Sequence, residues 1–578
     1  MSPLRSAMLF CSVEEQFAGA QAAQNLIAFH VVPTYETPDG RMVVMEHDLA
    51  AADAFVDAEQ GAGTGDRLFR MEPTSEIFLP GGARVEVVAG SAPAQFGPAV
   101  RALALAESAV RATVGVEAVV PWIAGARLFA NDPRQIEMAL QQARREAVLV
   151  NRRSAELAGA ASYMGSKREL SRFLVECFHA AGAPEETVVF DVMCGSGSAA
   201  GGFATEWPVV ASDAQEFALV LAQAQGAGLS VPEANAILAR VAAAAETHMA
   251  VLLDMVDAFV AREHLALHVG DEDAAAGLLA SLAAEMPTIA RPGHVGAWDP
   301  ARLVDDRRRD HGAQPRCLFT AYFANVFFGV RQCVEIDSLR YAIDTLDPAS
   351  KAWALAALVA TCTYTATTYG GHFAQPLAPD EVTLRRHIRR VVEKRSLPVA
   401  QEFAARLVSL AAESESCPHR VRTVRGPWRA AAESVARERS RPIWMYLDPP
   451  YRRDEYSRYY HVLETLMRYD YPPIQSRGLM PPKGPLRFSS EFFTRSPAKM
   501  RAALVDVLLE GLSHGWTVAW SYGSSGEASI VDVLEKVSET VPVEVASYSA
   551  PHRHVAHGGS RPRTVTEYLI VLRPGGRR

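Results

Sequence analysis

The stretch IWMYLDPPY, residues 443–451, predicts a buried strand that ends in a polar turn. Its first five residues are all apolar, which is typical of a central strand covered on both faces. Two prolines follow Asp448, and because proline cannot continue a central strand, the chain has to turn there. The turn leaves a carboxylate, backbone carbonyls and the ring of Tyr451 at the carboxyl end of a strand. In open α/β sheets this is the end where ligands bind.

Asp448, Pro449, Pro450 and Tyr451 form a group that suits the methylation of an exocyclic amine on a planar base. The carboxylate and the carbonyl of Pro449 can accept hydrogen bonds from an NH2 group and orient its lone pair. The tyrosine ring can stack on the base. Asp-Pro-Pro also makes ordinary turns, so this interpretation depends on a second motif upstream.

That second motif is VVFDVMCGSG, residues 188–197. A strand-like run ends at Asp191, and Gly195 and Gly197 follow it, where a ligand can approach the backbone closely. Position 200 is Ala, so the pattern differs from the dinucleotide fingerprint GxGxxG, and GSG alone is a weak signal.

Residues 208–212 predict a neighbouring strand that ends at Asp213. An acid at this place can bind ribose hydroxyls, as in other nucleotide-binding α/β folds. It can also cap the helix that we expect over residues 214–225. The ribose role is favoured because the two glycines and the two strand ends occur together.

Three segments, in this order, resemble the N6-adenine DNA methyltransferases of the Dam-like alpha group. They are YMGSK at 163–167, FDVMCGSGS at 190–198 and DPPY at 448–451. Further matches are YSRYYHVLETL at 456–466, WSYGS at 520–524 and TEYLIV at 566–571. The resemblance covers roughly residues 162–571, with long unmatched segments inside it.

The resemblance implies an α/β fold: a Rossmann-like methyltransferase sheet with a target-recognition insert and an extra N-terminal α+β domain. It implies S-adenosylmethionine as the cofactor, double-stranded DNA as the partner, and a flipped-out adenine as the target. The sulfonium is already an activated donor, so no metal is expected. A cognate restriction or defence-system protein is a further possible partner.

The resemblance also assigns roles to single residues. Asp448, Pro449, Pro450 and Tyr451 would be catalytic. The cofactor contacts would be Tyr163, Gly165, Lys167, Asp191, Met193, Gly195, Gly197, Asp213 and Asp448. The family usually has Phe where Met193 stands and often Pro where Val192 stands, although Met also fills an apolar pocket.

Two other functions stay open. One is methylation of a different amine, on RNA adenine or on cytosine N4, since related tetrapeptides serve those reactions. The other is a non-catalytic DNA-binding subunit that kept the fold. The intact Asp448, Tyr451, Gly195 and Gly197 favour an enzyme over such a subunit.

The composition favours a cytoplasmic globular protein. Hydrophobic residues make up 49% and charged residues 21% of the 578 residues, which suits a sizeable core and two to four domains. The seven cysteines form no CxxC pair, which argues for a reducing compartment and against a zinc site. No Pro-Cys dipeptide occurs, which disfavours cytosine-C5 methylation in its usual form. We expect neither a membrane-spanning stretch nor a signal peptide.

Four regions are expected along the chain: a domain of unknown role at 1–155, a cofactor-binding half at 156–275, a DNA-binding insert at 276–440 and a catalytic half at 441–578. Within them, residues 231–265 predict a packed helix pair and residues 264–273 a short strand. Residues 456–466 predict one helix beside the site. Strands are expected at 517–522, 543–548 and 565–571, with a basic loop at 552–563.

The expected DNA-binding surface follows from charge. The net charge of the chain is −8, yet residues 381–441 contain 14 Lys and Arg against 7 Asp and Glu, a local net charge of +7. Basic helices are often only solvated faces, but two clusters in the insert favour phosphate contacts. The residues chosen are Arg385, Arg386, Arg389, Arg390, Arg422 and Arg425.

Overall fold

The protein is described here by a computed structural model. It describes residues 2–10, 30–36, 42–44, 76–79, 83–86, 126–128, 167, 170–368, 372–438, 441–450, 455–475, 478–484, 486–523, 526–554 and 563–575.

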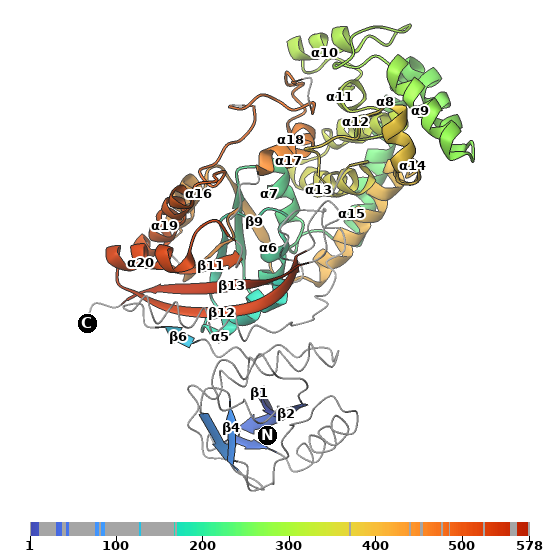
Figure 1. Ribbon diagram of the computed structural model, residues 1–578. Coiled ribbons are helices and arrows are strands. Elements are labelled where there is room, and N and C mark those ends of the chain that lie inside the picture. The colour runs from blue at the N-terminus through green and yellow to red at the C-terminus, as the bar shows by residue number, and fades with distance from the viewer. Residues whose placement is uncertain are drawn as a thin grey trace, which may run out of the picture.

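A mixed eight-stranded sheet organises the chain, as Figure 1 shows. Its order is β6-β12-β13-β11-β10-β7-β8-β9. The five strands from β11 to β9 run parallel, whereas β13 runs antiparallel between β11 and β12. The bounds are β6 Ala126–Leu128, β7 Val188–Asp191, β8 Val209–Asp213, β9 Val421–Arg425, β10 Ile443–Leu447, β11 Thr517–Gly523, β12 Val543–His554 and β13 Arg563–Pro574. The α/β expectation is therefore met.

Strand β10 is buried on both faces, as its unbroken apolar sequence predicts. Trp444 and Tyr446 point into one hydrophobic core, and Ile443, Met445 and Leu447 into the other. This alternation is the two-residue period of a pleated strand. The apolar run thus supplies both cores of the sheet from one strand.

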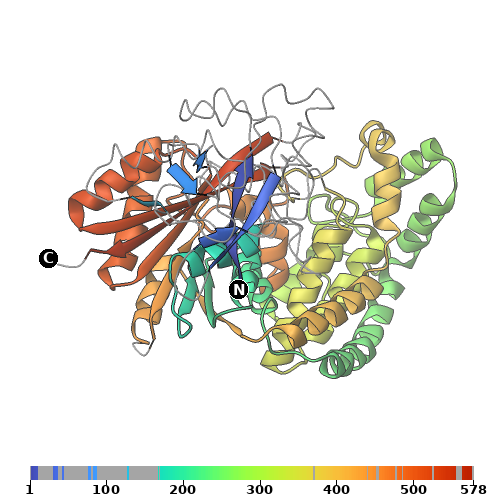
Figure 2. The same cartoon turned by 90° about the horizontal axis from the view of Figure 1, so that it is seen from below.

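Helices cover both faces of the sheet (Figures 1 and 2). One core contains buried residues of α5 Ser171–Ala180, α6 Ser198–Phe203 and α7 Glu216–Gln223. The other contains those of α16 Trp428–Ala436, α19 Pro497–Ser513 and α20 Ile530–Thr540.

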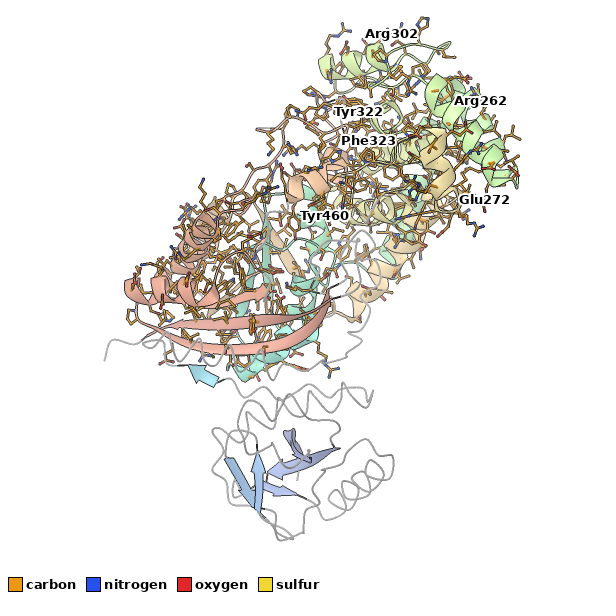
Figure 3. All side chains as sticks on the ribbon, in the orientation of Figure 1. Arg262, Glu272, Arg302, Tyr322, Phe323 and Tyr460 are labelled. Atoms are coloured by element: carbon orange, nitrogen blue, oxygen red, sulfur yellow. The ribbon has the colours of Figure 1, made fainter. Side chains whose placement is uncertain are left out.

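A helical lobe lies beside the sheet (Figure 2). It consists of α8 Val231–His268, α9 Glu272–Glu285, α10 Pro300–Arg309, α11 Leu318–Tyr322, α12 Val330–Ile343, α13 Pro348–Thr365, α14 Glu381–Arg395 and α15 Val399–Ser416. Tyr322 and Phe323 are fully buried inside it, while Arg262 forms an ion pair with Glu285 at its outer side (Figure 3).

Helix α8 corrects two expectations. The predicted helix pair is one continuous helix of 38 residues, started by a capping box in which Ser230 and Glu233 cap each other. The strand expected at 264–273 is also wrong, since α8 continues to His268 and Asp271 caps the next helix by accepting from Ala274 N at 2.7 Å. The helix continues because α9, α12 and α15 pack against it along its length.

By length and composition alone, α8 also contains a stretch apolar enough to cross a membrane. The expectation that no such stretch exists is therefore corrected. In this structure 28% of that stretch is buried, and the helix packs against α9, α12 and α15. One helix that passes this test by length and composition is weak evidence, so the observation does not place the chain in a membrane.

The lobe and the sheet divide the chain differently from the expected boundaries. Helix α8, assigned to the cofactor-binding half, packs within the lobe. Strand β9 and α16, assigned to the insert, belong to the sheet and its covering helices. The helical segment that leaves the sheet therefore runs from α8 to α15, because the chain returns to the sheet at β9.

The predicted helix over 456–466 is two short helices, α17 Tyr456–Tyr459 and α18 His461–Arg468, separated at Tyr460. Arg340 of α12 donates to Leu466 O at 2.9 Å and to Met467 O at 3.1 Å, at the carboxyl end of α18. A guanidinium at this end satisfies terminal carbonyls and favours the helix dipole. The lobe is thus tied directly to the segment that follows the DPPY motif.

The N-terminal region contains a three-stranded sheet of β1 Ser2–Phe10, β2 His30–Glu36 and β3 Met42–Val44, and a hairpin of β4 Glu76–Leu79 and β5 Ala83–Glu86. Strand β6 of this region pairs with β12, so part of the expected first domain joins the main sheet.

The loop expected at 552–563 is shorter than predicted. Strand β12 continues to His554, and β13 begins at Arg563, with His554 opposite Arg563 in the ladder. The extension gives the sheet a long antiparallel hairpin, which the short apolar runs at 543–548 and 565–571 did not indicate.

Candidate active site at the ends of strands β7 and β10

The site lies where two neighbouring parallel strands end. Strands β7 and β10 pair in register, with Tyr446 opposite Asp191, and Val192 N donates to Tyr446 O at 3.1 Å. From β7 the chain goes on to β8 on one side, and from β10 to β11 on the other. The strand order therefore reverses between β7 and β10, and the crevice outside the carboxyl ends at such a point is the usual ligand site in open α/β sheets.

The glycine loop after β7 is fixed by the acid that ends β8. Asp213 accepts from Gly195 N at 3.1 Å and from Gln215 N at 2.9 Å. Burial raises the pKa of Asp213 to about 6, although these backbone donors lower it. Asp213 thus holds the loop in place, and its predicted contact with a ribose stays a prediction.

The two glycines of the loop both adopt left-handed backbone conformations, with φ of 50° at Gly195 and 77° at Gly197. A Cβ atom on Gly197 would lie 2.4 Å from Ala222 Cα in α7. This glycine therefore permits the close packing of the loop against α7, a structural reason that the sequence interpretation did not consider.

Asp191 is fully buried at the end of β7. Burial raises the pKa of its carboxyl well above the ordinary value, and the charges of Asp448 and Asp213 raise it further. The N–H groups of Met193 and Ala200 favour the charged form, but neither carboxylate oxygen has a hydrogen bond of normal geometry within the described residues. An orphaned buried carboxylate of this kind suits a ligand that brings hydrogen-bond donors or positive charge.

Lys167 reaches the end of β10 from the first of the three motifs. Its Nζ lies 3.0 Å from Asp448 Oδ1 and 2.9 Å from Glu567 Oε1 of β13. Only 6% of the lysine side chain is exposed, so it is a buried site residue and not a solvated surface charge. Ser521 of β11 donates to Glu567 Oε1 at 2.9 Å. We call Lys167, Asp448, Glu567 and Ser521 the charged cluster.

Sequence reasoning missed Glu567 and Ser521 as site residues. Both lie in stretches that carry the resemblance, TEYLIV and WSYGS. An acid inside the strand-like run TEYLIV was the available signal, because an acid is seldom buried without a partner. What the sequence could not give is the order of strands that brings β13 beside β11.

Burial raises the pKa of Asp448 to about 7. Lys167 lowers this pKa and Glu567 raises it, since two carboxylates flank one ammonium. Asp448 is therefore divided between its neutral and charged forms near neutral pH, which makes it sensitive to any charge that arrives beside it.

The remaining predicted site residues fall into two groups. Pro449 is buried, Pro450 is half-buried, and Met193 packs at the edge of the second core. Tyr163, Gly165 and Tyr451 lie outside the described residues. Their predicted contacts stay predictions.

The predicted DNA-binding arginines of α14 are all exposed. Arg385 forms an ion pair with Glu381 at 2.7 Å, and Arg389 pairs with Glu272 of α9 at 2.7 Å. For Arg386 and Arg390 no ion pair is found within the described part of the chain. The helix therefore presents a mixed face on which some of the positive charge is already matched.

The two arginines of β9 are matched as well. Arg422 Nη2 lies 2.7 Å from Glu438 Oε1, and Arg425 Nη2 lies 2.5 Å from Glu216 Oε1. Both lie on the edge strand of the sheet and not on α14, so the six arginines are divided between two elements. Surface pairs of this kind contribute little to stability, and a phosphate can compete for them.

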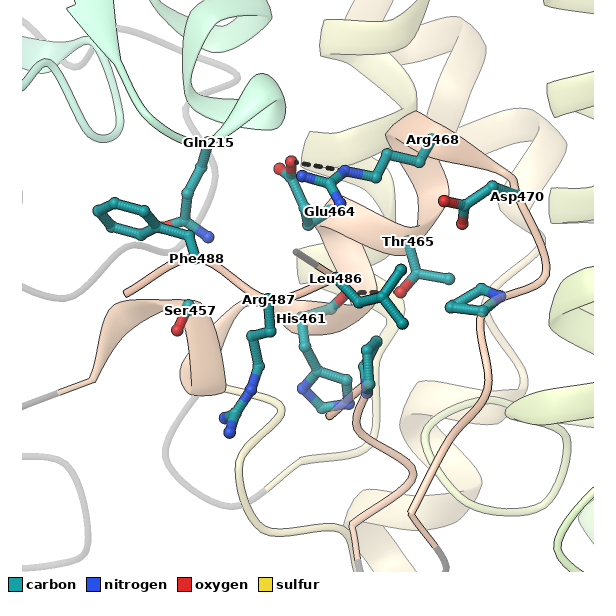
Figure 4. A pocket seen from close by; sticks show the side chains of 12 residues that line it. Gln215, Ser457, His461, Glu464, Thr465, Arg468, Asp470, Leu486, Arg487 and Phe488 are labelled. Carbon is teal, nitrogen blue, oxygen red and sulfur yellow. Dashed lines mark hydrogen bonds and ion pairs between the residues drawn. The ribbon is translucent and has the colours of Figure 1, made fainter. Parts of the chain in front are cut away.

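A small hollow lies beside α18 (Figure 4). It is lined by Gln215, Ser457, His461, Glu464, Thr465, Arg468, Asp470, Pro472, Pro481, Leu486, Arg487 and Phe488. The space in which the centre of a water molecule fits is about 20 Å³, room for water and too small for a base ring. Burial raises the pKa of Glu464 to about 7 and lowers that of His461 to about 4.

Within the described residues, no group of three His, Cys, Asp or Glu side chains is arranged to hold a metal ion. The polar groups at the strand ends are instead carboxylates, an ammonium and backbone N–H groups. They suit an organic cation that carries hydroxyl and amino groups. The predicted cofactor fits this set, because its sulfonium and amine complement the excess of carboxylates.

Comparisons with known proteins assign neither a family nor a function to the chain. No protein-family model matches the chain, and no curated protein and no solved structure matches it.

Proposed function

We propose that the chain is a DNA methyltransferase that transfers a methyl group from S-adenosylmethionine to the N6 amine of adenine. The fold would then be a Rossmann-like methyltransferase sheet whose helical lobe contacts the DNA. The single observation that carries the proposal is the meeting of the three motifs. Lys167, Asp191 with its glycine loop, and Asp448 come from distant parts of the chain and lie at one reversal of the strand order.

The cofactor would be held by the strand ends. Asp191 offers an unmatched buried carboxylate, and Asp213 fixes the Gly195 backbone. Lys167 offers a buried ammonium. When bound, S-adenosylmethionine supplies an activated methyl group, so the protein has only to position the acceptor and stabilise charge.

Asp448 would act on the acceptor amine. As a carboxylate it accepts a hydrogen bond from the NH2 group and stabilises the positive charge that develops on the nitrogen. The Pro449 carbonyl would accept the second N–H, and Tyr451 would stack on the base. Lys167 keeps the carboxylate oriented through the 3.0 Å ion pair. Because the amine lies inside the duplex, the adenine has to be flipped out first.

The test is transfer of an isotope-labelled methyl group to matched DNA and RNA substrates. Each product is digested, and the modified nucleosides are identified by mass. We expect N6-methyladenine in DNA. If the label is found only in RNA, or only on cytosine N4, the acceptor is not the N6 amine of adenine in DNA. Donor binding with no transfer to any of the substrates would favour a non-catalytic DNA-binding subunit.

A further inference from the structure

Negative charge exceeds positive charge at the candidate site. Asp448 and Glu567 both pair with Lys167, and the charge of Asp448 acts on Asp191 at the end of β7, where it raises the pKa of that carboxyl further. Tyr446 lies beside them on β10 and is fully buried. The next acid, Asp213, acts on Asp191 from β8.

Buried carboxylates so close to one another cannot all be charged at low cost. Like charges in a low-dielectric site hold a proton that would leave in water. Glu567 is only 3% exposed and keeps its distance of 2.9 Å from the Lys167 ammonium, with the Ser521 hydroxyl on the same oxygen. It therefore draws the ammonium toward itself and leaves Asp448 less fully compensated.

We propose that binding of the positively charged methyl donor drives a proton off Asp448, and that Glu567 is the positioning residue that keeps this proton on Asp448 beforehand, because it shares the Lys167 ammonium with Asp448. The inference rests on the proposed function, because the sulfonium supplies the charge. The O–H bond of the Asp448 carboxyl breaks, its electron pair stays on the carboxylate, and the proton passes to the buffer. No other bond changes.

The coupling has a purpose in the reaction. Before the donor binds, a neutral Asp448 avoids a cluster of uncompensated buried carboxylates. After the donor binds, Asp448 is a carboxylate and can accept a hydrogen bond from the amine. The acceptor function of Asp448 is thereby switched on by the presence of the donor.

The first measurement is calorimetry of donor binding to the full chain at pH 6.5, in buffers of low and high protonation enthalpy. A group whose pKa is about 7 before binding predicts release of roughly 0.5–0.8 protons per donor. S-adenosylhomocysteine lacks the sulfonium charge, so we expect it to release less than half as much. Heat that does not depend on the buffer, or equal release with both ligands, would overturn the inference.

One variant and its matched control test whether the released proton comes from Asp448. Glu567→Gln keeps the shape of the side chain but removes its charge, so Asp448 should already be ionised and the release should fall at least twofold. Glu464→Gln is the matched control, because Glu464 also has a pKa raised to about 7 but forms its ion pair with Arg468. Release that survives Glu567→Gln, or that is lost in Glu464→Gln, would contradict the assignment.

The parent protein gives an independent readout should the Glu567 variant not fold. The affinity for the donor should rise about tenfold between pH 6 and pH 8, and that for S-adenosylhomocysteine much less. Equal pH profiles would overturn the inference alone. A folded parent that binds no donor at any pH would overturn the proposed function itself, so the two failures are distinguishable.

Discussion

At the scale of single residues, Gly197 is a packing residue as well as a turn residue. Gly197→Ala would place a Cβ 2.4 Å from Ala222 Cα at a φ of 77°. We expect a loss of about 2–4 kcal/mol in the free energy of unfolding, from strain and overpacking together.

Denaturant unfolding of Gly197→Ala and of Gly182→Ala separates the two causes. Gly182 has nearly the same φ, 79°, and a Cβ atom added there would meet nothing within 4 Å. Its substitution therefore reports backbone strain alone, about 1 kcal/mol. Equal losses in the two variants would show that the contact with α7 is not the reason for the glycine.

The raised pKa of Asp448 predicts that the free energy of unfolding depends on pH. Its pKa is raised to about 7 in the folded chain, above the unfolded value, so the folded state binds more protons between about pH 4 and pH 7. Stability from this group is therefore lost as the pH rises through that window. Asp448→Asn stays neutral, so its stability relative to the parent should increase by about 1–3 kcal/mol from pH 5 to pH 8.

The measurement is the free energy of unfolding of both proteins across this pH range. Glu464→Gln should show a rise of the same sign, because burial also raises the pKa of Glu464 to about 7. A difference between Asp448→Asn and the parent that does not change with pH would contradict the raised pKa.

At the scale of elements, the sequence was informative wherever an element buries a continuous apolar face. The run 443–447 predicted β10 with its bounds, and 188–191 and 208–212 predicted β7 and β8 closely. Prediction failed where the outcome depends on packing, as in the 38-residue α8, whose continuity is supported by α9, α12 and α15. It also missed β9, because the arginines of VRTVR, which lie on an edge strand, indicate a charged cluster more strongly than a strand.

Helix α14 carries the prediction on DNA binding. Arg386 and Arg390 are exposed and show no ion pair within the described residues, so they are the arginines best able to take phosphates. Replacing both by Gln should weaken DNA binding and reduce the slope of log affinity against log salt by about 2.

The control is the pair Arg172→Gln and Arg501→Gln, on helices that cover the sheet. These side chains are also exposed, by 62% and 38%. If both pairs of substitutions change the salt dependence equally, α14 is not a specific part of the DNA surface.

At the scale of the whole molecule, the topology is what sequence alone could not supply. The glycine loop and DPPY could each be placed at the end of a strand, and the resemblance put Lys167 with them. The order of the strands places β13 next to β11 and thereby brings Glu567 and Ser521 to the same edge. The lobe from α8 to α15 lies between β8 and β9 in the chain, although these two strands pair in the sheet, and Arg340 of the lobe binds the carboxyl end of α18.

The proposed function requires that the edge formed by β7 and β10 transfers a methyl group. The most direct measurement compares the parent with Asp448→Asn in donor binding by calorimetry and in labelled methyl transfer to DNA. We predict that the variant still binds the donor and that its transfer falls at least about 100-fold, because a hydrogen-bond acceptor in the transition state is lost. Transfer by the folded variant at a rate near that of the parent would contradict this claim.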